Sequence, residues 1–169
     1  MRGDASDERA QMGKVMFYHL TRSAPADTLA LLLPKALTQG WRVMLRGSEA
    51  DALSQMDAAL WLLGGDDSFL PHGQEGGPFD CDQPVLLGHG PAVNGAKVLG
   101  LIDGAGAEDA EIAGMERVWV LFDGNDPQRL QAARDQWKAM TSAGHGAEYW
   151  SEEGGRWEKK AESLARLAP

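Results

Sequence analysis

The most informative stretch of the sequence is KVMFYHLTRSAPADTLALLLPKALTQGWRVMLR, residues 14–46. KVMFYHL, at 14–20, is an apolar run with a β-branched residue and two aromatic residues, which is typical of a mostly buried strand. Leucines then recur at helical spacing until Gly40, which stands where a C-terminal cap belongs, and Pro34 predicts a kink inside this helix. WRVMLR, at 41–46, predicts a second strand. The order strand, helix, strand is typical of proteins with a parallel sheet.

Strands and helices continue to alternate along the rest of the chain. One further helix is predicted over SEADALSQMDAALWLL, 48–63, and another from Asp126, as its N-cap, to Ala143. We therefore predict a three-layer α/β domain with a largely parallel sheet, on which ligands would sit beyond the carboxyl ends of the strands. The remaining predicted elements are a weak helix near 108–113 and the short strands PVLLG at 84–88, KVLGLID at 97–103, ERVWVLFDG at 116–124 and AEYW at 147–150.

Some segments fall outside this alternation. The segment 64–82 is rich in glycine and proline and predicts a long surface loop. RWEKKAESLARLAP, at 156–169, is charged and is interpreted as a helix that frays. Residues 1–11 contain no apolar run, which predicts a disordered extension. Because 169 residues is the length of one compact domain, we expect that extension, a single domain over 12–161 and a tail over 162–169.

The charge balance restricts the possible partners. The chain has 16 Lys and Arg against 25 Asp and Glu, a net charge of −9, which opposes the binding of nucleic acid over the whole surface, so contact with DNA would be local or indirect. The single cysteine, Cys81, cannot form an internal disulfide or a CxxC zinc site. No continuous apolar run reaches the ~18 to 20 residues of a membrane helix, and the N-terminus does not resemble a signal peptide. We therefore expect a cytoplasmic protein without membrane attachment.

The motifs predict no catalytic residue, metal site or cofactor. The turn after the first strand, TRSAPAD at 21–27, has no glycine, so the Rossmann fingerprint and the phosphate loop are both missing from the place where they should occur. HGPAVNGAK, at 89–97, is glycine-rich but opens no strong helix and is interpreted as a turn. The alternative is a small α/β enzyme or nucleotide-binding protein that uses residues near the strand ends, which are His19, His72, His89, His145, Asp66, Asp67, Asp103, Asp123 and Asp126.

The last predicted helix carries two cations beside an indole. Helical spacing places Arg134, Lys138 and Thr141 on one stripe, with Trp137 on its border. One interpretation is an ordinary amphipathic helix with solvated charges. The other is a pocket that takes an apolar side chain on the indole and a carboxylate between the cations.

A set of short motifs follows one another in a characteristic order and spacing between Met12 and Ala161. They are FYHLT at 17–21, GWRVMLR at 40–46, AALW at 58–61, DDSFLPHG at 66–73, VLGLIDG at 98–104, ERVWVLFDGND at 116–126, WKAMTSAGH at 137–145 and RWEKKA at 156–161. In this set the chain resembles the chi subunit of the bacterial DNA polymerase III holoenzyme. The resemblance implies a nucleotide-binding-like α/β fold that has lost the phosphate loop, in a non-catalytic accessory subunit of the clamp-loader assembly.

The same resemblance implies partners and the residues that bind them. The family links the clamp loader, through the psi subunit, to the acidic C-terminal tail of single-stranded-DNA-binding protein, so that DNA is reached only indirectly. The tail site maps onto Arg134, Trp137 and Lys138, with Thr141 where some members carry another cation. The segment SFLPHG, with Phe69 and His72, is similar to the stretch that faces a partner subunit. For Phe69 the alternative is a loop residue folded back onto Trp61.

Overall fold

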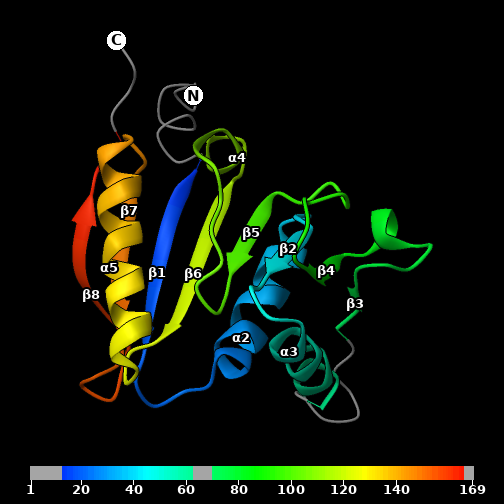
Figure 1. Cartoon of the computed structure of the whole chain (residues 1–169), viewed down its shortest axis with the longest axis horizontal. Helices are drawn as coiled ribbons and strands as arrows, with labels where there is room; N and C mark the ends of the chain where they lie inside the picture. Colours follow the sequence, from blue (N-terminus) through cyan, green and yellow to red (C-terminus); the bar gives the residue numbers. More distant parts are fainter. Residues whose placement is uncertain (1–12, 63–69, 166–169) are drawn as a thin grey trace.

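The computed structural model describes residues 13–62 and 70–165, which form a single eight-stranded sheet flanked by helices (Figure 1). The strands lie in the order β3-β4-β2-β5-β6-β1-β7-β8, and all neighbours are parallel except β7 and β8. The strands are β1 Lys14–Leu20, β2 Val43–Arg46, β3 Gly73–Gln74, β4 Val85–Gly88, β5 Val98–Leu101, β6 Arg117–Asp123, β7 Ala147–Ser151 and β8 Glu158–Ser163. The helices are α2 Pro25–Thr38, α3 Ala50–Leu62, α4 Asp109–Ala113, α5 Pro127–Ser142 and the 3-10 turn η1 Asp80–Asp82.

Helices cover both faces of the sheet, which confirms the predicted three-layer α/β fold. Alternate side chains of β1 point to opposite faces, because successive residues of a strand do so. Val15 and Phe17 belong to the core cluster under α4 and α5, whereas Met16 and Tyr18 pack against the cluster under α2 and α3. In Figure 1, α5 lies at the end of the sheet formed by β7 and β8, and α3 lies toward β4.

The predicted helices around 26–40 and 126–143 correspond to α2 and α5. Helix α2 continues past Pro34 to Thr38, and Gly40 follows it with a φ of 79°, the left-handed conformation that glycine adopts at helix ends. The N-cap of α5 is Asp126, as predicted, and its carboxylate accepts hydrogen bonds from the N–H groups of the first turn.

The C-terminal segment is a strand, so the prediction of a frayed helix over 156–169 is wrong for the residues that the structure describes. Strand β8 pairs antiparallel with β7 and extends to Ser163, inside the predicted tail. Trp157, just before β8, packs edge-on against Tyr18 with ring centroids 5.6 Å apart. Pairing with β7 and burial of one indole thus outweigh the helical tendency of a charged segment.

The predicted loop 64–82 is only partly irregular. Gly73–Gln74 forms the short edge strand β3, which pairs with β4, and Asp80–Asp82 forms the turn η1. Residues 63–69 lie outside the described part of the chain.

We predict that Trp157→Ala lowers the free energy of unfolding by about 2 kcal/mol, because it removes a half-buried indole from Tyr18. The matched control is Arg156→Ala, since the Arg156 side chain is 84% exposed. Denaturant unfolding of both variants measures the difference, and equal stability would show that the hairpin does not depend on this contact.

Candidate functional site

The candidate tail site lies on the outer surface of α5. Trp137 is half-buried and packs edge-on against Phe17, with ring centroids 5.3 Å apart, and against Tyr149, at 6.0 Å. These aromatic contacts come from β1 and β7, so the sheet fixes the position of the indole. The ring is therefore part of the core cluster and part of the surface at once.

Arg134 and Lys138 are exposed on either side of this indole in the helical sequence. Within residues 13–62 and 70–165, neither cation has a carboxylate within ion-pair distance. Thr141 is half-buried, and its hydroxyl donates a hydrogen bond of 2.7 Å to the carbonyl of Trp137. The four predicted residues thus form one stripe, in which two cations are open to a ligand and Thr141 is engaged with its own helix.

Tyr149 is a further member of this site that was not predicted from the sequence. Its hydroxyl lies 3.0 Å from Nδ1 of His19, a residue that is buried. Burial raises the pKa of the Tyr149 phenol, and the positive charge of Arg134 offsets part of that rise. The alternation of AEYW predicts only which face of the strand Tyr149 occupies. Its meeting with Trp137 depends on β7 lying beside β1.

Of the two residues predicted at the partner-subunit interface, the structure describes only His72. Phe69 lies outside the described residues. His72 is buried, with Nδ1 2.7 Å from the carbonyl of Leu70 and Nε2 3.3 Å from the carboxylate of Asp57. Its ring also lies 4.2 Å from that of Trp61, which is 52% exposed. His72 thus holds the chain against α3 and presents little surface of its own.

Among the described residues, the four histidines of the alternative enzyme have separate partners and do not form one site, and Asp66 and Asp67 lie outside the described part of the chain. His89 bonds the carbonyl of Gly47, and His145 contacts Asp109 at 3.0 Å, in separate parts of the molecule. At the carboxyl end of β2, Arg46 binds Glu111 through two hydrogen bonds of 2.7 Å, which lower the pKa of that carboxyl. Among the described residues, no group of three or more His, Cys, Asp or Glu side chains could hold a metal ion.

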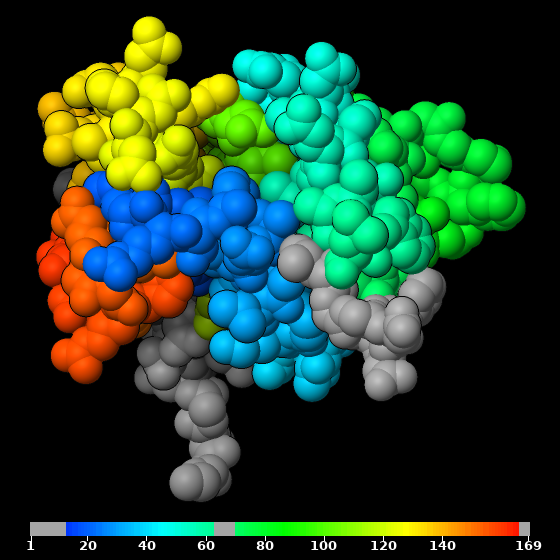
Figure 2. All heavy atoms as spheres, turned by 90° about the horizontal axis from the view of Figure 1, so that it is seen from below, coloured from blue at the N-terminus to red at the C-terminus, as the bar shows by residue number. Residues whose placement is uncertain are grey.

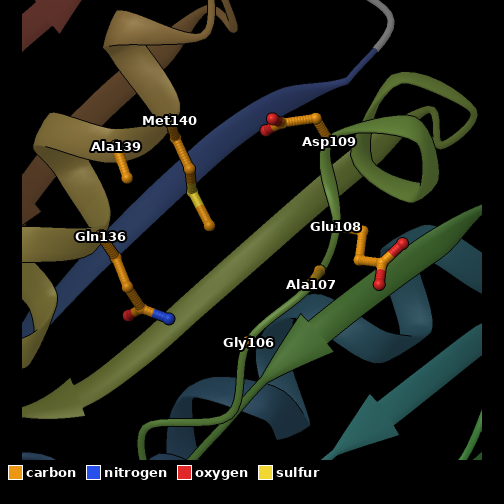
Figure 3. Close-up of a pocket in the computed structure, with 7 residues that line it drawn as sticks. All are labelled: Gly106, Ala107, Glu108, Asp109, Gln136, Ala139 and Met140. Carbon is orange, nitrogen blue, oxygen red and sulfur yellow. The ribbon is translucent and has the colours of Figure 1, made fainter.

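A cavity of about 400 Å³ lies between α5 and the segment that leads into α4 (Figure 3). Figure 3 shows Met140 and Gln136 on the α5 side and two acidic residues, Glu108 and Asp109, across from them. The carboxylates make this cavity unsuitable for an anionic peptide, since like charges repel. The cations of α5 therefore offer the better surface for an acidic partner.

The fold and this surface define a class: a three-layer α/β protein with no glycine in the turn after its first strand and with two exposed cations beside an indole on α5. The family model described as DNA polymerase III chi subunit, HolC, matches residues 12–148, and the chain belongs to that family. The protein is thus an accessory subunit of DNA polymerase III, which acts in replication. A comparison with curated proteins finds no match. The described helices include none that is long and apolar enough to cross a membrane.

We predict that Trp137→Ala lowers the free energy of unfolding by about 3 kcal/mol, because the indole packs against Phe17 and Tyr149. Lys138→Ala, one residue further along α5, should change it by no more than about 0.5 kcal/mol, as expected for an exposed side chain. Thermal and denaturant unfolding distinguish the two variants. Equal stability of the two variants would mean that the packing of Trp137 does not stabilise the fold.

Proposed function

We propose that this chain is a non-catalytic subunit that links the clamp loader, through the psi subunit, to the acidic C-terminal tail of single-stranded-DNA-binding protein on the lagging strand. It acts in the cytoplasm without a cofactor and reaches DNA only through these partners. One observation carries the proposal: Arg134 and Lys138 are exposed and lack a carboxylate partner among the described residues, beside an indole that the core holds in place.

Electrostatics support an acidic peptide as the ligand of this surface. The chain carries a net charge of −9, so an acidic tail is repelled at long range and can be held only where cations are concentrated. Arg and Lys recognise carboxylates through charge-assisted hydrogen bonds, and an indole accepts an apolar side chain. Binding should therefore weaken as the salt concentration rises.

For the psi subunit we propose the segment that contains Phe69 and His72. Two observations support this choice: His72 contacts Asp57 of α3, and Trp61 and Leu62 at the end of the same helix are 52% and 83% exposed. Exposed apolar side chains that lie together are typical of a protein interface. In this proposal His72 positions the segment, and the side chains near it make the contact.

The alternative function, an α/β enzyme or nucleotide-binding protein, makes the opposite prediction for small ligands. A ligand that binds only the folded state raises the melting temperature. We expect ATP, dNTPs and divalent metal ions to leave the melting temperature of the purified chain unchanged, and we expect no nucleotide turnover. Turnover that disappears in Asp103→Asn or Asp123→Asn would favour the enzyme.

We predict that Arg134→Glu abolishes binding of the acidic tail peptide, and that Lys138→Ala weakens it about tenfold, or about 1.4 kcal/mol. The peptide is the C-terminal tail of single-stranded-DNA-binding protein, and isothermal titration measures its affinity. Arg156→Glu is the matched control, because it makes the same change of net charge at an exposed position on the β7–β8 hairpin. Unchanged affinity of Arg134→Glu, in a domain that circular dichroism shows to be folded, would place the tail elsewhere.

A further inference from the structure

The turn between β1 and α2 binds a carboxylate. The backbone N–H groups of Thr21, Arg22 and Ser23 all donate to Oε1 of Glu152, at 3.0, 2.8 and 2.7 Å. The hydroxyl of Ser23 donates to the other carboxylate oxygen, Oε2, at 2.8 Å. Glu152 directly follows β7 and is only 5% exposed, so this anion is enclosed by the protein.

Successive N–H groups that converge on one oxygen form the type of nest that binds phosphate in other proteins. This turn also leads into the N-terminus of α2, where the helix dipole favours negative charge. In open α/β sheets the phosphate of a nucleotide is bound at this position, beyond the carboxyl end of the first strand. The turn therefore keeps the donors of an anion site although it contains no glycine.

The electrostatic state of Glu152 fits an ionised ligand. Burial by itself raises the pKa of this carboxyl, but the N–H groups of Ser23, Arg22 and Thr21 and the Ser23 hydroxyl together outweigh it and lower the pKa. The hydroxyl of Thr21, in the same turn, is buried and has no hydrogen-bond partner among the described residues. One donor group at the turn thus remains unused.

We propose that residues 21–23 form an oxyanion-binding site whose ligand is supplied by the chain itself, so that Glu152 keeps inorganic phosphate and phosphorylated ligands out. The same contact fastens the β7–β8 hairpin to the β1–α2 turn. Figure 2 shows the blue residues of this turn against the orange residues of the hairpin, on one face of the molecule. Glu152 lies beyond residues 12–148, which match the family model, so the carboxylate that occupies this site comes from a segment outside the match.

The proposal predicts that the protein gains phosphate binding when the Glu152 carboxylate is removed. Glu152→Ala in the full chain should melt about 5 to 10 °C below the unmodified protein, because it leaves the buried N–H groups without an acceptor. Inorganic phosphate should then raise the melting temperature of Glu152→Ala by about 3 to 5 °C at ten times its dissociation constant, and the rise should continue with the logarithm of the phosphate concentration. Sodium chloride of equal ionic strength should not do so.

Two further variants separate site binding from general effects of salt. Glu152→Gln keeps the shape of the side chain, so it should be destabilised but should not respond specifically to phosphate. Glu153→Ala removes an exposed carboxylate at the next position and should behave like the unmodified protein. Should Glu152→Ala not fold, Glu152→Ser, which also vacates most of the site, carries the same comparison.

The outcomes are distinct. A phosphate response confined to Glu152→Ala or Glu152→Ser supports the proposal. An equal response of the unmodified protein, or no response of either small variant while both are folded, overturns it. Phosphate held by the cations of α5 would stabilise the unmodified protein and Glu152→Ala alike, so the difference between the two reports on residues 21–23 alone and is independent of the tail-binding function.

Discussion

The position of β1 inside the sheet, between β6 and β7, is the constraint on which the rest of the structure depends. β1 pairs with β6 on one side and with β7 on the other, so its backbone groups are satisfied along its length. Its side chains then connect the two outer layers. Phe17 supports the indole of Trp137 under α5, and Tyr18 supports Trp157 on the opposite face. The turn after the same strand receives Glu152.

The charged side chains of this protein differ in whether they have partners within the chain. Several carboxylates are engaged by the chain itself, as Asp126 is at the start of α5 and Glu111 is with Arg46. Arg134 and Lys138 are exposed and have no such partner within the described residues. In the function that we propose, this small cationic surface holds the acidic tail locally, against the long-range repulsion of an acidic molecule.

In the proposed function, the aromatic residues of the candidate site combine stability with recognition. Phe17, Trp137 and Tyr149 pack on one another, and the cations stand beside them on the same helix. An anchor that is already ordered in the free protein loses little entropy on binding, which favours affinity in a small interface. Mutation of such a residue changes folding and binding together, so the charged neighbours give the clearer experiments.

The sequence by itself determined the alternating elements, the missing glycines after the first strand and the stripe of Arg134 and Lys138, because helical and strand periods are local properties of the chain. It did not determine β8, because the charged sequence of this segment is also typical of a helix. Nor did it determine the contact of Tyr149 with His19 or the hydrogen bonds of Glu152 with Ser23. Tyr149 and His19 are 130 residues apart in the sequence, and Glu152 and Ser23 are 129 residues apart. Only the strand order, which places β7 beside β1, brings them together. Long-range pairing depends on the packing of the whole sheet, and no local pattern records it.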